Sequence, residues 1–400
     1  MKHYWRMGFA LVALVASLSA CRRDGTPDTP EAAVAADEDL KALVALPYLS
    51  WTTEEADPAK LGVTLWDAER AWNGLNLYTN DVNEAYLMDM AGRRLHSWKL
   101  PEEFTHCEHF ELLPGGGVVL VCVGQGLIRL DRDSNVLWEL RKRIHHDVAV
   151  AEDGSFWVPI RGRGRRYQGR KVGFDGLIRV SAGGEILDHW RSWNHLPELQ
   201  ARHGASHLDS PLIGEAPKKN YDYYHLNSVE VLPTTPLGTR DERFRAGNLL
   251  ICLRNVHLIA ILDQDTFAVT WSWGPGELSF PHMPTMLADG HVLVYDNGVD
   301  RERSRVLEID PATDEIVWSF AGDPPESFFS KRRGSNQRLP NGNTLIAESE
   351  RGRVFEVNRD GQMVWEFWNP EMRRGRRKRI YRFMRRAEDE VRELFRSPPR

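Results

Sequence analysis

Short apolar strands, each interrupted by a turn that contains glycine, recur along most of this 400-residue chain. The clearest copy covers residues 280–298, where an apolar strand, the turn Asp289-Gly290 and a second apolar strand follow one another. Behind each such pair comes another apolar strand, a polar turn and a strand that carries tryptophan. Together the two patterns predict units of four short antiparallel strands.

The tryptophans mark the period of the repeat, because each stands seven to nine residues after the polar turn of its unit. Such repetition is typical of a β-propeller. We therefore predict an all-β fold, a six-bladed β-propeller of four-stranded blades over residues 40–370, whose first blade lacks its opening strand. Rings of this size fill the gaps between neighbouring blades, so we expect a structural role for all six. They are Trp98, Trp138, Trp190, Trp271, Trp318 and Trp365.

Two stretches interrupt the regular spacing. A loop from about Asn194 to Tyr223 is inserted between the third and fourth units, and residues 161–171 contain six basic residues and no acidic one. The basic stretch is interpreted either as a solvated hairpin loop or as a rim that attracts anions.

The end of the chain differs from the rest in charge. Residues 371–400 hold twelve Lys or Arg and five Asp or Glu, a net charge of +7. Because the whole chain has a net charge of −5, the remainder carries −12. We predict a basic amphipathic helix over 371–400 that packs on the outside of the propeller or, alternatively, contacts anionic lipid. Its apolar positions recur every three or four residues: Ile380, Phe383, Met384, Ala387, Val391, Leu394 and Phe395.

The beginning of the chain is predicted to be a processing signal. Lys2 and Arg6 precede an apolar run that is too short to span a bilayer, so residues 1–20 are interpreted as a signal peptide. The run ends in Leu18-Ser19-Ala20-Cys21, which resembles the bacterial lipoprotein signal, with an ordinary signal peptide as the alternative. The resemblance implies lipidation of Cys21, a membrane anchor, and a periplasmic protein held at the outer membrane. Residues 21–39 are expected to form a disordered tether.

The other cysteines and the charge exclude several classes of function. Cys107 and Cys122 are candidates for a disulfide between neighbouring strands, which leaves Cys252 buried and free. Without a Cys-x-x-Cys motif, neither thiol redox chemistry nor a structural zinc site is expected. An acidic, exported body also argues against nucleic acid as a partner. The sequence does not define an oligomeric state.

Histidines recur at equivalent positions in the repeat. His146 and His282 both stand eight residues before a turn glycine, and Asn227 occupies that position in the fourth unit with His225 two residues earlier. His106 and His109 lie in the matching stretch of the second unit. Because the first strand of each blade lines the central channel, we expect these side chains to converge there. Neutral imidazole can act as a nucleophile, general base or metal ligand, although the close spacing of a zinc site is missing.

Several motifs resemble those of the bacterial aryl sulfotransferases, in the same order, from about Leu61 to Pro370. The resemblance implies a periplasmic six-bladed propeller that moves a sulfuryl group from one phenol to another, without a nucleotide sulfate donor, a metal or another cofactor. The motifs are His145-His146-Asp147, Tyr224-His225-Leu226-Asn227-Ser228, Ile251-Cys252-Leu253-Arg254-Asn255, and His282 with Tyr295-Asp296-Asn297-Gly298.

The resemblance also implies roles for individual residues. His282 is expected to be the nucleophile that becomes transiently sulfated, while His225 and Arg254 stabilise the sulfuryl oxygens. His146, or its neighbour His145, is expected to assist proton transfer at the phenol.

Asn227 and Asn297 are expected to bind the substrate, a phenol or an aryl sulfate. The alternative function is a non-catalytic propeller lipoprotein that serves as a binding scaffold in the cell envelope. A metal or quinone enzyme is the third. Imidazoles that meet beside Arg254 favour the sulfotransferase, whereas dispersed histidines favour the scaffold.

Overall fold

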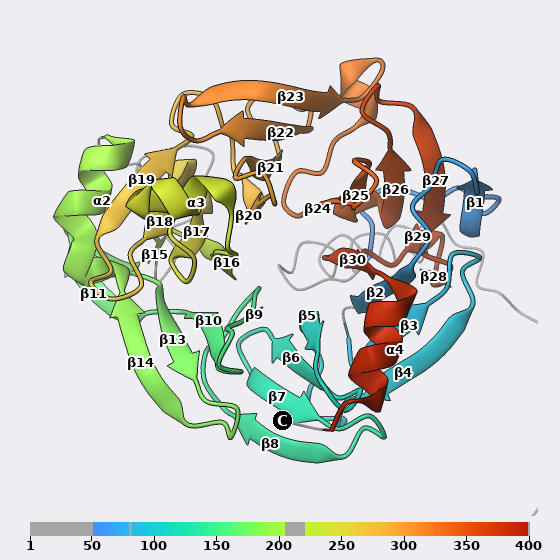
Figure 1. Ribbon diagram of the computed structural model, residues 1–400, viewed down its shortest axis with the longest axis horizontal. Helices are drawn as coiled ribbons and strands as arrows, with labels where there is room; N and C mark the ends of the chain where they lie inside the picture. Colours follow the sequence, from blue (N-terminus) through green and yellow to red (C-terminus); the bar gives the residue numbers. More distant parts are fainter. Residues whose placement is uncertain (1–50, 80–81, 205–220, 399–400) are drawn as a thin grey trace, which may run out of the picture. The chain divides into compact units, whose positions relative to one another are not determined.

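Six antiparallel sheets of four or five strands form the main framework of the described residues, which are 51–79, 82–204 and 221–398 of the computed structural model. Figure 1 shows these sheets arranged around a centre, with one short edge strand of each sheet pointing inward. The arrangement is propeller-like. The expected signal peptide, Cys21 and the tether all lie outside the described residues.

Neighbouring strands within each sheet are antiparallel, and the first strand named for each sheet is the innermost. Sheet one is β30 (Phe383–Arg386), β2 (Leu75–Thr79), β3 (Glu84–Met88) and β4 (Arg94–Lys99); sheet two is β5 (Cys107–Leu112), β6 (Val118–Cys122), β7 (Gly126–Leu130) and β8 (Val136–Leu140); sheet three is β9 (Ala149–Val150), β10 (Phe156–Ile160), β13 (Gly176–Val180) and β14 (Ile186–Arg191). Sheet four is β16 (Leu226–Val231), β17 (Leu249–Leu253), β18 (Leu258–Leu262) and β19 (Val269–Trp273); sheet five is β20 (His282–Met286), β21 (Val292–Asp296), β22 (Arg305–Asp310) and β23 (Glu315–Ala321); sheet six is β24 (Ser335–Arg338), β25 (Thr344–Glu348), β26 (Arg353–Val357), β27 (Met363–Trp368) and β1 (Gly62–Trp66).

The turn between the first two strands of a sheet explains the recurrent glycine. Gly154, Gly290 and Gly342 have φ angles of 82°, 98° and 88°. A side chain is disfavoured in this left-handed region, so glycine is the residue that lets the inner strand reverse tightly into its neighbour.

Both ends of the described chain complete sheets that begin elsewhere in the sequence. Strand β1 pairs with the outer strand β27, and β30, near the C-terminus, pairs with β2 as the inner strand of sheet one. The prediction that the first unit lacks its opening strand was therefore wrong, because the C-terminal segment supplies it.

The helix predicted over residues 371–400 is shorter in the structure, because part of this segment forms the strand β30. Residues Phe383–Arg386 are extended, and only α4 (Glu388–Arg396) is helical. Apolar residues three and four apart fit a helix, but the unpaired edge of β2 offers four backbone partners, and this pairing outweighs the local pattern. Helix α4 packs through Val391, Leu394 and Phe395 on the cluster that includes Trp98.

The tryptophans join neighbouring sheets, as their position in the repeat predicted. Trp98, Trp190 and Trp365 are at most 1% exposed. In five of the six cases the indole N–H reaches a turn of the next sheet. The acceptors are Gly116 for Trp98, Ala182 for Trp138, Asp314 for Trp271, Arg359 for Trp318 and Met90 for Trp365.

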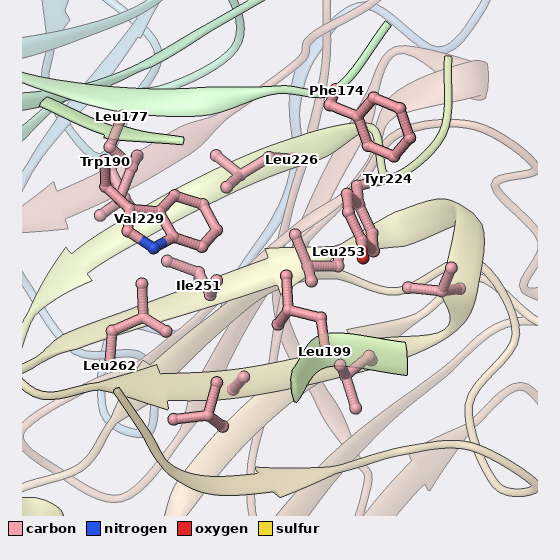
Figure 2. Packing of buried hydrophobic residues seen from close by; sticks show 14 of the residues in the cluster. Phe174, Leu177, Trp190, Leu199, Tyr224, Leu226, Val229, Ile251, Leu253 and Leu262 are labelled. Carbon is pink, nitrogen blue, oxygen red and sulfur yellow. The ribbon is translucent and has the colours of Figure 1, made fainter. Parts of the chain in front are cut away.

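Trp190 contributes through packing. Figure 2 shows its ring against Leu177 of its own sheet and against Leu226 and Val229 of sheet four. The cluster continues through Ile251 and Leu262, so the apolar core fills the gap between sheets three and four. Burial of one large ring in such a gap removes roughly 150–250 Å² from water.

Smaller elements decorate the sheets. The basic stretch forms the predicted hairpin, and residues of the predicted insertion add a helix and a short parallel strand. These elements are β11 (Gly164–Tyr167), β12 (Arg170–Gly173), β15 (Tyr221–Asp222), β28 (Met372–Arg373), β29 (Arg376–Arg377), α2 (Leu196–His203) and α3 (Pro236–Arg240), with 3₁₀ turns at Ser192–His195, Glu242–Phe244, Arg254–Val256, Pro325–Ser327 and Ser349–Arg351. Across the described part of the chain, no helix has the length and apolar character needed to traverse a bilayer.

The cysteine prediction is confirmed. Cys107 and Cys122 form a disulfide between the neighbouring strands β5 and β6, and Cys252 is buried and free. The disulfide closes a short hairpin at the start of β5, directly before residues that face the centre.

Candidate active site

The inner strands begin at one end of the central region, and the predicted histidines lie at these beginnings. His225 precedes β16, His282 opens β20, and His146 stands three residues before β9. Pairing of the inner strands is interrupted at the same level, between Cys107 and His109 in β5 and between Leu226 and Ser228 in β16. Such bulges redirect side chains, here those of Glu108 and Asn227.

His146 and His225 are in direct contact. Their Nε2 atoms are 3.1 Å apart, and the ring centroids are 4.9 Å apart. Each Nδ1 faces a carboxylate: His146 is 2.7 Å from Glu108 Oε2, and His225 is 2.6 Å from Asp222 Oδ2. Two residues far apart in sequence are thus joined into a four-membered chain of carboxylate, imidazole, imidazole and carboxylate.

The two carboxylates are ionised. Burial alone would raise the pKa of Glu108, but the charges of His146 and Arg333 outweigh burial and lower this pKa. Burial would also raise the pKa of Asp222, but its interaction with the His225 ring and the charge of Arg161 together lower this pKa. Arg333 Nη2 is 3.1 Å from the second oxygen of Glu108.

One proton is shared between the two rings. Ionised Glu108 and Asp222 each accept from an Nδ1–H, so both Nε2 atoms would present lone pairs to each other unless one carries a proton. Burial lowers the pKa of His225 to about 4, which disfavours the charged form of that ring. The pair therefore consists of an imidazolium that donates to a neutral imidazole.

His282 is held in one tautomer. Its Nδ1 lies 2.6 Å from Asn297 Oδ1 and 3.2 Å from the carbonyl oxygen of Phe280. The amide orientation of Asn297 is fixed, because Nδ2 donates to the carbonyls of Ser330 and Arg333. Nδ1 of His282 is thus the donor, and the lone pair resides on Nε2.

The free-base form of His282 is favoured by its surroundings. Burial, followed by the charge of Arg254, holds the pKa of His282 well below its usual range, and His225 and His146 act in the same direction. These electrostatic effects require proximity, so the three histidines and Arg254 occupy one neighbourhood. We refer to His146, His225, His282 and Arg254 as the His cluster.

Arg254 offers unused donors. It follows β17, its Nη1 donates to Asn255 Oδ1 at 2.9 Å, and its guanidinium lies 4.7 Å from the centre of the Phe280 ring. Its buried Nε has no hydrogen-bond partner among the described residues. Burial lowers the pKa of Arg254 to about 10, which still leaves it charged at neutral pH.

The remaining predicted residues support this arrangement. His145 is fully buried beside His146, with ring centroids 4.8 Å apart, and neither of its ring nitrogens has a hydrogen-bond partner within the described part of the chain. Asn227 donates to the carbonyl of Pro281 and so fixes the residue before His282. Asn297 uses its amide to hold His282, a positioning contact where a substrate contact was expected.

The backbone is unusual at the same place. His146 and His225 have φ angles of 66° and 50°, a left-handed conformation that non-glycine residues adopt rarely. Such conformations cost roughly 1–3 kcal/mol each and gather at functional sites. Here they turn the two rings toward each other.

Sequence analysis did not identify Glu108, Asp222, Arg333 or Tyr381. The Tyr381 ring stacks on His146 at 5.7 Å and comes from the C-terminal segment before β30. Acidic residues beside a recurrent histidine, as in His106-Cys107-Glu108-His109, were the available signal for Glu108. Asp222 and Tyr381 lie in segments that were assigned to an insertion and to a helix.

A large cavity occupies the other end of the inner strands. Its volume is about 1190 Å³, and its wall includes Asp147, Ser228, Met286 and Asn336. The wall does not contain any member of the His cluster. We call it the axial cavity.

One group in the described ranges 51–79, 82–204 and 221–398 has ligand atoms close enough for a metal ion. Asp289, His291 and Glu308 bring such atoms within 4.8 Å of one another. Glu308 already pairs with Arg338 and Arg359 at 2.6 and 2.5 Å, so a cation there would compete with two arginines.

Comparisons with known proteins come from three sources. The model of a family described as arylsulfotransferase (ASST) matches residues 109–370. A protein of unknown function from Bacteroides caccae shares 13% identity with a TM-score of 0.52, over 79% of this chain and 100% of that one. A virginiamycin B lyase from Staphylococcus aureus, solved with quinupristin, shares 10% identity with a TM-score of 0.45, over 78% and 89%. No curated protein gives a significant match.

Proposed function

The chain belongs to the arylsulfotransferase family, and we propose that it transfers a sulfuryl group from an aryl sulfate to a phenol through a sulfohistidine at His282. The observation that carries this proposal is the free Nε2 lone pair of His282, fixed by the Nδ1 contact with Asn297 beside the Arg254 guanidinium. We also infer that the six larger sheets are the blades of a propeller whose central channel gives access to this nitrogen.

In the first half-reaction, His282 Nε2 attacks the sulfur atom of the aryl sulfate. The N–S bond forms while the bond from sulfur to the aryl oxygen breaks, and the phenolate leaves. The proton of the His146–His225 pair passes to this oxygen, which makes the phenol the leaving group.

In the second half-reaction, the acceptor phenol returns the proton to the pair as its oxygen attacks sulfur. The N–S bond breaks and His282 regains its lone pair. Neither half requires an oxidant, a nucleotide or a metal, because the sulfuryl group and one proton simply change partners.

Charge on the three sulfuryl oxygens needs fixed donors in the transition state. The Nε–H of Arg254 has no partner among the described residues, and a guanidinium fork suits an anionic group with several oxygens. We assign Arg254 this role. His225, expected to share it, is assigned mainly to the proton pair, because its Nε2 faces His146.

The predicted N-terminal signal and the disulfide support a proposal on the location of the protein. We propose that Cys21 is lipidated and holds the protein on the periplasmic side of the outer membrane. The Cys107–Cys122 disulfide supports export, since such bonds persist in oxidising compartments.

The decisive experiment separates the two half-reactions. The purified full chain in detergent is incubated with 4-nitrophenyl sulfate in the absence of an acceptor, and the intact mass is measured. We expect one added sulfuryl group, mapped by peptide sequencing to His282, and its loss on addition of phenol.

The matched pair is His282→Ala and His291→Ala, both in sheet five. His282→Ala should lose transfer by at least about 10³-fold and gain no mass, as expected for loss of a nucleophile, whereas His291→Ala should behave as wild type. Equal turnover by His282→Ala and wild type would instead support a non-catalytic scaffold in the cell envelope.

A further inference from the structure

The axial cavity is separate from the His cluster. Asp147 and Arg382 line its wall, and each is the sequence neighbour of a residue at the cluster, His146 and Tyr381. Their side chains form an ion pair of 2.5 Å that is almost completely buried. This pair marks the boundary between the two regions.

Several other charges of the cavity wall are also paired within the protein. Glu111 pairs with Arg386 at 2.8 Å, and Glu308 pairs with Arg338 at 2.6 Å. A charged ligand would have to break such pairs to gain a partner of opposite sign, which is costly for buried ions. The wall is therefore poorly suited to an aryl sulfate or another anion.

Neutral groups in the same wall are unmatched. Both side-chain atoms of Asn336, which is 1% exposed, lack a hydrogen-bond partner among the described residues, as does the hydroxyl of Ser228, which is 3% exposed. A buried polar group without a partner costs about 1–3 kcal/mol. The two residues come from different sheets, β24 and β16, so the unmatched groups belong to the cavity and not to one strand.

Glu230 adds a third neutral group. Its Oε2 accepts from the Met286 N–H, and burial raises the pKa of this carboxyl to about 8. At pH 7 the carboxyl is mostly protonated and acts as a donor. Amide, hydroxyl and carboxylic acid together offer donors and acceptors without net charge.

Apolar side chains complete the wall, among them Val148, Met286, Leu339 and Leu394. Such a surface suits the C–H faces of a sugar ring, whose hydroxyls supply both kinds of hydrogen bond. We propose that the axial cavity binds a neutral oligosaccharide. The volume of about 1190 Å³ exceeds the range typical of drug-sized ligands, about 300–1,000 Å³, and accommodates several sugar units.

The test uses the full chain in detergent and three neutral probes: maltotriose, cellotriose and triacetylchitotriose. Binding is measured by saturation-transfer difference NMR and by calorimetric titration. We expect at least one probe to bind to wild type and to His282→Ala alike, so that failure of the sulfuryl-transfer proposal leaves this result unaffected.

Two variants connect binding to the cavity. Asn336→Leu and Ser228→Ala should each weaken binding by about threefold to tenfold, the worth of one hydrogen bond, while sulfuryl transfer is unchanged. Neither variant should lower the melting temperature, because neither removes a hydrogen bond of the protein. If Asn336 had a purely structural role, Asn336→Leu would lower the melting temperature.

The proposal is overturned if none of the three sugars binds with a dissociation constant below about 10 mM, which is weaker than the ~1 mM of a 4 kcal/mol interaction. It is also overturned if a sugar binds equally well to both variants, or if 4-nitrophenyl sulfate or a neutral tripeptide competes for the cavity more tightly than the sugars do.

Discussion

The His cluster and the axial cavity lie at opposite ends of the same inner strands, yet they differ in which polar groups have hydrogen-bond partners. At the cluster, carboxylates hold Nδ1 of His146 and of His225, and Asn297 holds Nδ1 of His282. In the cavity, Glu111, Asp147 and Glu308 are paired with arginines, but the neutral groups of Asn336 and Ser228 have no hydrogen-bond partner among the described residues. The cluster is organised to direct a proton and a lone pair, and the cavity to receive hydrogen bonds from outside.

The difference shows how one repeated scaffold supports two kinds of site. Bulges at Glu108 and Asn227 redirect the first residues of the inner strands, and left-handed backbone at His146 and His225 does the same before the strands begin. Beyond the bulges the strands are regular and their side chains alternate. Irregular backbone therefore coincides with the candidate chemistry, and in sheet five it continues to Met283 in the cavity wall.

Substitution of Arg254 should change the His cluster strongly and leave the axial cavity unchanged. Arg254→Ala should lower kcat by about 10²–10³, the usual cost of one transition-state donor. Binding of the sugar probes in the cavity should not change. Steady-state kinetics with 4-nitrophenyl sulfate and phenol, beside the calorimetric titration, measures both quantities. Loss of both activities would mean that the two regions are not independent.

Substitution of Glu108 should lower kcat less than substitution of Arg254, and Glu111 provides a matched control. Glu108 and Glu111 both lie on β5 and both contact a histidine, but only Glu108 faces the cluster. Glu108→Gln should lower kcat about 10- to 100-fold, less than the 10²–10⁴ of general acid–base catalysis, because His146 stays in place.

Glu111→Gln should leave kcat within about twofold of wild type, because it touches no reacting group. A role for Glu108 in proton donation also predicts a larger loss for phenyl sulfate than for 4-nitrophenyl sulfate, since the poorer leaving group needs the proton more. An equal loss of kcat for the two aryl sulfates would mean that Glu108 has only a structural role.

The smallest effect concerns pH and the cavity. Because the folded-state pKa of Glu230 is raised from 4.5 to about 8, the protonated form stabilises the fold fully below pH 4.5, and this contribution is lost as pH rises through 8. Glu230→Gln removes the titration. The melting temperature of wild type should therefore fall more steeply between pH 5 and 8.5 than that of the variant, as measured by differential scanning calorimetry. Parallel curves would contradict a protonated Glu230.

The sequence predicted the repeating features better than the unique ones. Short strands and tryptophans repeat in every unit and turn glycines in most of them, so their pattern identified the sheets and the convergence of His146, His225 and His282. The partners of these histidines do not repeat. Glu108 depends on a bulge, and Tyr381 on a strand that pairs across 309 residues, from Asn76 to Arg385. Neither residue is part of a pattern that repeats along the sequence.

The C-terminal segment has a consequence for truncated forms of the protein. Tyr381 contacts His146, Arg382 pairs with Asp147, and β30 occupies the open edge of β2. A polypeptide truncated before residue 380 lacks all three, however well its other sheets have formed. Any copy without residues 380–386 leaves the inner edge of sheet one open and deprives His146 of the Tyr381 ring and Asp147 of its arginine.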